Sequence, residues 1–182
     1  KGLIDDSLFR LGIFYITPQL TLENMGYTSN IYQYDTDPKP DWTADIGVSV
    51  RIATLLGKRF IFTVTEHPFY SFYVDNKQEQ AWNNEFEFAV YSYLGPFNLK
   101  FALDRNNVRQ RPSSEFGIRV RYLTEREKFT VDLGKQKTFY ISLYGENSRL
   151  NYKDTEYLDD YDLTQLMDQK QYNMAYRFYG QL

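Results

Sequence analysis

Few residues in this chain could carry covalent or metal chemistry. Its 182 residues include one histidine, His67, and no cysteine, which excludes disulfides, thiolate nucleophiles, and thiolate or multi-histidine metal sites. A serine nucleophile must lie within about 3 Å of its imidazole partner. Ser71 follows His67 by four residues, about 13 Å away on an extended strand, so the two form no dyad unless the chain turns at Pro68. A serine from a neighbouring strand remains a possible partner of His67, but we expect no enzymatic activity.

An acidic segment, "DTEYLDDYD" (154–162), is the other candidate for chemistry. Hard cations bind clustered carboxylates, so this segment could hold Ca²⁺ or bridge divalent cations to lipopolysaccharide. It lacks the spacing and the glycine of an EF-hand loop, and such a run is typical of a solvated loop. We therefore expect no metal site and no cofactor.

The composition favours strands and excludes a nucleic-acid partner. Aromatic residues make up 18% of the chain, with 17 Tyr and 14 Phe, and they suit strands and membrane interfaces. The net charge is -3 and the pI is about 5.3, without a basic stripe. No run approaches the roughly 18 apolar residues of a spanning helix, and the mean hydropathy is -0.58. Hydropathy does not detect a membrane β-barrel, because polar residues that face the lumen alternate with the apolar residues that face lipid.

Apolar and polar residues alternate along most of the chain, which predicts strands with one apolar and one polar face. The clearest case is "WTADIGVSVRIA" (42–53). Similar alternation covers 14–23, 60–65, 85–94, 99–104, 115–122, 129–133, 139–143 and 172–178. No stretch has a helical period. The pattern alone leaves open whether the apolar face meets a sheet, a helix or lipid.

The connections between these segments alternate in length. Those at 55–59, 94–97 and 134–137 are short, whereas 24–41, 66–82, 105–114 and 153–169 are long and polar. Outer-membrane barrels have this asymmetry, with short periplasmic turns and long outer loops. We therefore predict an all-β fold, an antiparallel up-and-down transmembrane β-barrel in a single domain over residues 1–182. About eight strands are expected, with both chain ends on the periplasmic side; they either close a barrel or form the N-terminal half of one with about 16 strands.

One stretch, "YLTEREKF" (122–129), disturbs this count because the apolar positions change from even to odd numbers across it. A turn there would give nine strands. We predict instead one long strand from about 115 to 134 with a β-bulge near 124–128, which preserves the alternation of connections. Such a strand is taller than an apolar band of about 25 Å, so its upper part would rise above the membrane.

The alternation also assigns residues to two faces. We expect the lumen to be lined by Glu23, Asp45, Arg51, Glu85, Glu87, Lys100, Asp104, Glu115, Arg119 and Arg121. We expect lipid to contact Phe14, Ile16, Leu20, Ile46, Val48, Val50, Phe86, Phe88, Val90, Ile118 and Val120. The charged set either creates a transverse field across an aqueous pore or forms a salt-bridge network that fills a narrow lumen. Two interfacial girdles are expected to contain Trp42, Tyr70, Phe72, Tyr73, Trp82, Tyr91, Tyr93 and Phe97.

The opening "LGIFYITPQLTLENMGYTSNIY" resembles the first strand and loop of β-barrel porins of Gram-negative outer membranes, in which a strand runs through "TP" into "GYxSNxY". The matching positions here are Thr17, Pro18, Gly26, Tyr27, Ser29, Asn30 and Tyr32. "AWNNEFEF", "RPSSEFGIRVR" and "YRFYGQL" extend the resemblance over nearly the whole chain, although no motif is catalytic. The resemblance implies an outer-membrane barrel of a type often linked to surface polysaccharide systems and usually longer than this chain. "GKQK" (134–137) departs from the proline-containing turn that is common in this family.

Together these features predict a non-enzymatic protein of the bacterial outer membrane that acts as a porin-like channel or export conduit for small solutes or polysaccharide. One alternative is a non-conducting structural or surface-docking barrel within an envelope assembly, and another is a soluble β-sandwich binding module. The expected partners are outer-membrane lipid and lipopolysaccharide, together with envelope proteins or further copies of the chain, and no nucleic acid. The transport step is inferred by analogy of fold.

Overall fold

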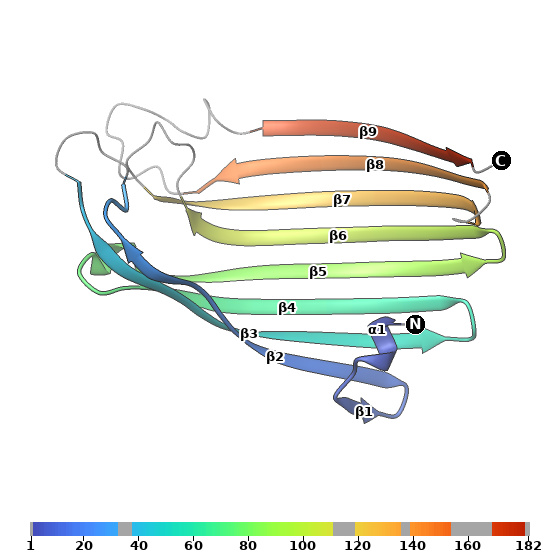
Figure 1. The fold of residues 1–182 in the computed structure, drawn as a ribbon, viewed down its shortest axis with the longest axis horizontal. Helices are drawn as coiled ribbons and strands as arrows, with labels where there is room; N and C mark the ends of the chain where they lie inside the picture. Colours follow the sequence, from blue (N-terminus) through green and yellow to red (C-terminus); the bar gives the residue numbers. More distant parts are fainter. Residues whose placement is uncertain (1, 33–37, 111–118, 136–138, 154–168, 181–182) are drawn as a thin grey trace.

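A computed structural model describes residues 2–32, 38–110, 119–135, 139–153 and 169–180. They form one antiparallel sheet of nine strands, and each strand pairs with its neighbours in the sequence (Figure 1). The strands are β1 (Phe9–Leu11), β2 (Phe14–Thr28), β3 (Asp41–Leu56), β4 (Phe60–Tyr73), β5 (Ala81–Leu94), β6 (Phe97–Gln110), β7 (Val120–Lys135), β8 (Phe139–Tyr152) and β9 (Gln169–Gly180). A four-residue helix α1 (Gly2–Asp5) and a 3₁₀ turn η1 (Lys77–Glu79) complete the described elements. Within this described part of the chain, no helix is long and apolar enough to cross a membrane.

The predicted all-β, up-and-down antiparallel fold is confirmed. The long strands β2 to β9 match the expected eight, and β1 adds a three-residue strand that pairs with Phe14 to Ile16 on β2. Alternation did not predict β1, because three residues are too few to display a period. The sheet is open: among the described residues, β9 pairs only with β8, and β2 has no second partner beyond Ile16.

Short and long connections lie at opposite ends of the sheet, as predicted. β3, β5, β7 and β9 end at one end of the sheet, here called the turn end (Figure 1). β2, β4, β6 and β8 end at the opposite end, here called the loop end. At the turn end, Gly95 has φ 68° in the two-residue turn between Leu94 and Phe97, a conformation that favours glycine.

Three long connections begin later than the alternation indicated. β2 continues to Thr28, β4 to Tyr73 and β6 to Gln110, whereas the sequence predicted connections over 24–41, 66–82 and 105–114. The strands were underestimated because near the loop end their outward positions become polar, for example at Glu66 and Arg105, and the alternation disappears. The pairing of backbones continues beyond the change in side-chain polarity.

β7 corrects the prediction of a bulge near 124–128. Its pairing with β6 and with β8 keeps one register over its whole length. The apolar positions change parity for another reason: Val120 and Tyr122 face the interior near the loop end, whereas Phe129 and Val131 face outward near the turn end. The described strand begins at Val120, and residues 115–118 lie outside the described residues.

The register shift that the structure does contain lies in β2, between Glu23 and Gly26. Asn24 has φ 49° there, a left-handed conformation that asparagine tolerates better than most residues. Beyond the shift, Tyr27 pairs with Trp42, and the two rings lie 5.7 Å apart between centroids. The bulge therefore turns the Tyr27 side chain toward the face that carries Trp42.

β3 and β4 approach each other closely at Gly47. A Cβ atom at this position would lie 2.6 Å from Phe69 Cβ and 2.8 Å from the carbonyl oxygen of Pro68. The pairing of β3 with β4 is interrupted between Gly47 and Val50, opposite Pro68, which has no N–H group. Only glycine leaves room for this approach.

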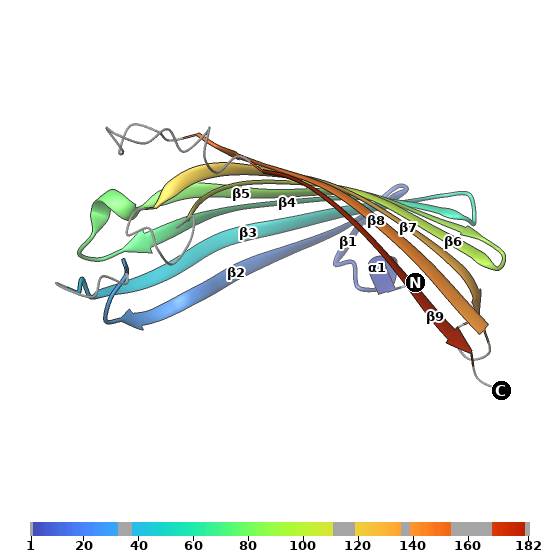
Figure 2. The same ribbon diagram turned by 90° about the horizontal axis from the view of Figure 1, so that it is seen from above.

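The two faces of the sheet differ in polarity, since directly paired residues share a face. One row of pairs on the polar face, from β2 to β8, consists of Thr17, Arg51, Thr65, Glu87, Asp104, Arg126 and Ser148. The adjacent row on the apolar face begins with Ile16, Ile52, Val64, Phe88 and Leu103. The sheet is strongly twisted and curved (Figure 2), so side chains of the polar face converge near the loop end.

Candidate functional site

The polar face carries a half-open cavity of about 920 Å³ near the loop end. Its lining comes from all strands between β2 and β7 and from Asn30 and Ile31 in the connection β2–β3.

Charges of opposite sign line different sides of this cavity. The carboxylates are those of Glu23 on β2, Asp45 on β3 and Glu85 on β5. The positively charged residues are Arg126 on β7 and Arg119, which immediately precedes β7. Arg109 on β6 is also part of the lining, but it pairs directly with Arg121, and its guanidinium binds Glu79 and the carbonyl oxygen of Gln78 at the rim. Four predicted lumen residues thus line the cavity: Glu23, Asp45, Glu85 and Arg119. Arg109 and Arg126 were missed because each lies in a stretch with several charged residues and no clear alternation.

Four other predicted lumen residues lie on the polar face outside the cavity lining: Arg51, Glu87, Lys100 and Asp104. Lys128 forms an ion pair with Asp104, and the Lys100 ammonium lies 5.3 Å from the centroid of the Tyr91 ring. Arg51 Nε is buried and has no hydrogen-bond partner among the described residues. This part of the face therefore combines paired charges with an unsatisfied donor.

Arg121 corrects one lumen prediction. It alternates on β7 with Tyr122, which lines the cavity, so Arg121 faces the other side of the sheet. Its guanidinium donates to Asn107 Oδ1 at 3.2 Å and to the carbonyl oxygen of Trp82 at 3.0 Å. The last predicted lumen residue, Glu115, lies outside the described residues.

Thr21, His67 and Glu85 form a chain of hydrogen bonds in the cavity wall. Thr21 Oγ1 lies 2.9 Å from His67 Nε2, and His67 Nδ1 lies 3.3 Å from Glu85 Oε2. Thr21 is on β2 and His67 is on β4, so this contact crosses over the intervening strand β3 at Gly47. Sequence reasoning excluded Ser71 as a partner of His67, and Ser71 in fact hydrogen-bonds to Asn83. It could not find Thr21, which precedes His67 by 46 residues.

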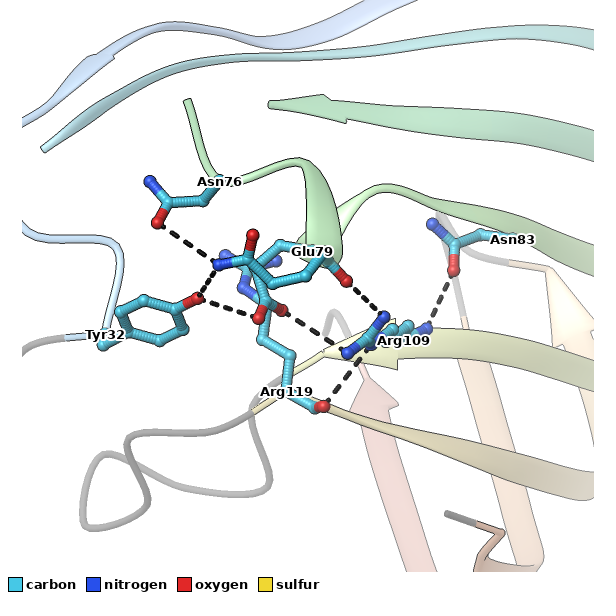
Figure 3. Close-up of polar contacts among 7 residues, drawn as sticks. Tyr32, Asn76, Glu79, Asn83, Arg109 and Arg119 are labelled. Carbon is cyan, nitrogen blue, oxygen red and sulfur yellow. Dashed lines mark hydrogen bonds and ion pairs between the residues drawn. The ribbon is translucent and has the colours of Figure 1, made fainter. Parts of the chain in front are cut away.

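A network of polar contacts fixes the connections at the loop end (Figure 3). Glu79 is 7% exposed; its Oε1 accepts from the Tyr32 hydroxyl at 2.8 Å, and its Oε2 lies 3.8 Å from Arg109 Nη2. Arg109 also donates from Nη1 to the carbonyl oxygen of Gln78 at 2.8 Å, and its backbone N–H donates to Asn83 Oδ1. The connections β2–β3 and β4–β5 are therefore tied to β5 and β6 at the rim of the cavity.

Tyr73 and Arg119 pack together at the same rim. The Arg119 guanidinium lies 4.9 Å from the centroid of the Tyr73 ring. Burial raises the pKa of the Tyr73 hydroxyl above its ordinary value, and the positive charge of Arg119 opposes this shift only in part. Tyr73 therefore stays neutral at physiological pH and offers a hydrogen-bonding group to the cavity.

Asp41, the first residue of β3, holds the start of the connection β4–β5. Its carboxylate is 1% exposed and accepts hydrogen bonds from the backbone N–H groups of Val74, Asp75 and Asn76 and from the Asn76 side chain, at 2.8 to 3.1 Å. Burial acts to raise the pKa of Asp41, but these hydrogen bonds to the ionised form outweigh it and the net pKa is lowered.

The apolar face leaves many large hydrophobic side chains exposed. Leu20 is 76% exposed, and most of the outward side chains on other strands are exposed as well, among them Ile46, Val48, Phe101, Phe129, Leu143 and Met174. The predicted lipid-contacting residues on this face are Phe14, Ile16, Leu20, Ile46, Val48, Val50, Phe86, Phe88 and Val90. A soluble monomer rarely exposes so much continuous apolar surface.

Val120 corrects one prediction for this face, because it is 0% exposed and lies on the same side of β7 as Tyr122. Ile118 lies outside the described residues. Near the loop end the usual polarity is inverted: Val108, Val120 and Tyr152 are buried, while Arg105 faces outward. The prediction from alternation therefore assigned the residues near the start of β7 to the wrong faces.

The exposed apolar residues form a band, here called the apolar band, that crosses the strands obliquely. One row of pairs runs from Phe14 on β2 through Thr54, Phe62, Val90, Phe101 and Phe129 to Gly145 on β8. On β2 the turn-end border of the band lies in this row, at Phe14. On β8 the band extends six residues further toward the turn end, from Gly145 to Phe139. Six residues over six strand-to-strand steps, at about 3.3 Å per residue and 4.8 Å per strand, correspond to a tilt of about 35°.

The opposite border of the apolar band shifts in the same direction. On β2 this border lies at Leu22, eight residues from the row toward the loop end. On β8 it lies at Leu143, two residues from the row toward the turn end. Ten residues over six steps give a tilt of about 50°. Beyond this border, one outward row contains Glu66, Phe86, Arg105, Glu125, Arg149 and Lys170, so it is mostly charged.

Aromatic side chains lie on the apolar face near both ends of the sheet. At the loop end, Trp42 packs on Tyr27, and Trp82 packs on Tyr70 with centroids 5.2 Å apart. At the turn end the outward aromatic residues are Phe14, Phe60, Phe97 and Phe139. Tyr73, Tyr91 and Tyr93 were also expected in the girdles, but their positions on β4 and β5 place them on the polar face.

Comparisons of the chain with protein-family models, with curated proteins and with solved structures gave no match.

Proposed function

We propose that the chain forms the wall of an outer-membrane β-barrel and that small solutes pass along its polar face. The observation that carries this proposal is the oblique apolar band, whose two borders imply strands tilted by about 35° and 50°. Strands of outer-membrane barrels are tilted by about 35–45°. A soluble sheet has no reason to limit its exposed apolar residues to an oblique band bordered by aromatic and charged rows.

The polar face supports the transport part of the proposal. Carboxylates from β2, β3 and β5 line the cavity together with arginines from β6, from β7 and from the residue before β7. Opposed charges across an aqueous passage orient and select dipolar or ionic solutes. The polarity of the cavity suits small hydrophilic solutes.

Conductance in a planar lipid bilayer tests the channel. We expect stepwise ion conductance after insertion of the detergent-extracted protein, and Asp45→Asn should shift the reversal potential in a salt gradient because it removes a negative charge from the cavity wall. Glu125→Gln is the matched control: Glu125 faces outward beside Arg105, so its removal should leave the reversal potential unchanged. A protein that stays monodisperse without detergent would contradict the membrane location itself.

A second candidate function, a non-conducting barrel that docks a partner, is favoured by the network at the loop end. Tyr32, Glu79 and Arg109 hold two connections at the rim of the cavity, and Ile31, next to Tyr32, is buried and lines the cavity. This second function predicts that the inserted protein does not conduct ions. A double variant, Tyr32→Phe with Glu79→Gln, should then gain conductance, because it removes the contacts that hold the two connections.

A further inference from the structure

We propose that Thr21, His67 and Glu85 form a nucleophile, general base and orienting carboxylate that hydrolyse small, water-soluble carboxylic esters inside the cavity. The proposal does not depend on whether the barrel conducts. It departs from the expectation of no enzymatic activity, which rested on the distance between His67 and Ser71.

The hydrogen bonds assign each group its role. A carboxylate can only accept, so Glu85 Oε2 requires a proton on His67 Nδ1. In the neutral imidazole the lone pair is then on Nε2, 2.9 Å from Thr21 Oγ1, where it can accept the hydroxyl proton of Thr21. This is the tautomer that a general base needs to accept a proton from a hydroxyl nucleophile.

The backbone holds the three groups together. Gly47 lies between Thr21 and His67, and a Cβ there would lie 2.9 Å from Thr21 Oγ1 and 2.6 Å from Phe69 Cβ. The missing side chain lets Thr21 reach over β3. The imidazole is further held by stacking on Phe69, with centroids 5.2 Å apart and an interplanar angle of 29°.

The location of the triad defines the class of substrate. Thr21, His67 and Glu85 all line the cavity, and the His67 side chain is 16% exposed. On β2, Thr21 alternates with Leu20 and Leu22, which face the opposite side of the sheet. The acyl chains of membrane lipid would therefore not reach the hydroxyl, whereas a polar ester within the cavity would.

The reaction is an ordinary two-step hydrolysis. Thr21 Oγ attacks the ester carbonyl carbon as its proton passes to His67 Nε2, and the tetrahedral adduct collapses with cleavage of the bond to the leaving oxygen, which takes that proton and departs as an alcohol. Water then attacks the acyl-threonine, gives its proton to the same nitrogen, and releases the carboxylic acid as Thr21 regains its proton. Asn106, which pairs with Glu85, and Arg126 also line the cavity and carry the N–H donors that an oxyanion requires.

The test has two readouts on the full chain in detergent. A fluorophosphonate probe should attach to Thr21, as located by peptide mass spectrometry, and 4-nitrophenyl acetate should be hydrolysed faster than by the variants. Thr21→Val and His67→Gln should each reduce the rate by at least about 100-fold, since each removes a group that acts as part of one unit. Thr21→Ser should keep both the adduct and the hydrolysis.

Thr17→Val is the matched control, because Thr17 lies on the same face of β2 outside the cavity lining and should leave the rate unchanged. Far-UV circular dichroism identifies variants that fail to fold. The labelling experiment uses the unmodified protein, so it does not depend on the folding of any variant. An absent adduct on Thr21, or hydrolysis by folded Thr21→Val at the unmodified rate, would overturn the proposal and show that the three groups only stabilise the wall.

Discussion

Val48 and Ser49 are adjacent on β3 but face opposite sides of the sheet. Val48 lies in the apolar band and is exposed there, whereas Ser49 faces the polar side. If the band lies in hydrocarbon, Val48→Lys should reduce the free energy of unfolding from lipid vesicles by about 2–4 kcal/mol. Ser49→Lys should change it much less, because its ammonium would face water. Urea titration of both variants in vesicles measures the difference, and equal effects would argue against lipid on this face.

Asp41 predicts a dependence of local stability on pH. Its folded-state pKa is lowered below the ordinary value of 3.8, so its carboxylate stabilises the folded state above that pH, and this contribution is lost as the pH falls through the folded pKa. The amides of Val74, Asp75 and Asn76 should therefore exchange hydrogen faster at low pH after correction for intrinsic rates.

Asp41→Asn should show the fast exchange already at neutral pH, because an amide replaces the acceptor-only carboxylate with a group that also carries donors. The expected cost at the connection is about 1–3 kcal/mol. Mass spectrometry of exchanged peptides measures it, and protection of residues 74–76 that is independent of both pH and the substitution would refute this role.

At the scale of elements, the contact between β3 and β4 depends on Gly47. Gly47→Ala would place a Cβ 2.6 Å from Phe69 Cβ and 2.8 Å from a backbone oxygen, so one strand must move. We expect a loss of about 1–3 kcal/mol, the usual cost of overpacking. Gly145→Ala on β8 is the control, because no atom lies within 4 Å of its added Cβ. Similar unfolding midpoints for the two variants would contradict the close approach.

The strands could be predicted from the sequence because a period of two is a local property of the chain. The alternation located every long strand and the ends at which the connections lie. It missed the loop-end parts of β4 and β6 and assigned residues in the loop-end part of β7 to the wrong face, since the polarity of the two faces changes at the border of the apolar band while the backbone continues. Residues such as Arg121 and Val120 were assigned to the wrong face for this one reason.

The site was less predictable than the strands because it depends on contacts between distant segments. Glu23, Asp45, Glu85 and Arg119 follow from the alternation, and they line the cavity. The contact of Thr21 with His67 depends on the register of three strands and on a missing side chain at Gly47. No spacing in the sequence encodes that combination.

At the scale of the whole molecule, the open sheet predicts a larger assembly. β9 has pairing on one side only among the described residues, and unpaired N–H and C=O groups are not tolerated in hydrocarbon. If the sheet spans a membrane as proposed, we therefore expect the particle extracted in detergent to exceed the 21.7 kDa of this chain, with strands of another copy or of a partner paired to β9 and β2.

Native mass spectrometry measures the particle, and denaturing mass spectrometry separates a longer polypeptide from several copies of one chain. A native particle near 21.7 kDa, without bound protein, would mean instead that β9 and β2 close the barrel between themselves in lipid. The lumen would then have the narrow, side-chain-filled interior of an eight-stranded barrel.

Each hydrogen-bonded neighbour in this sheet is also a neighbour in the sequence. Gain or loss of one β-hairpin, such as β5 with β6, would therefore leave the direction of every other strand unchanged and keep each connection at its own end. The width of the wall can change in evolution by duplication of a short stretch of gene, two strands at a time, without redesign of the remaining chain.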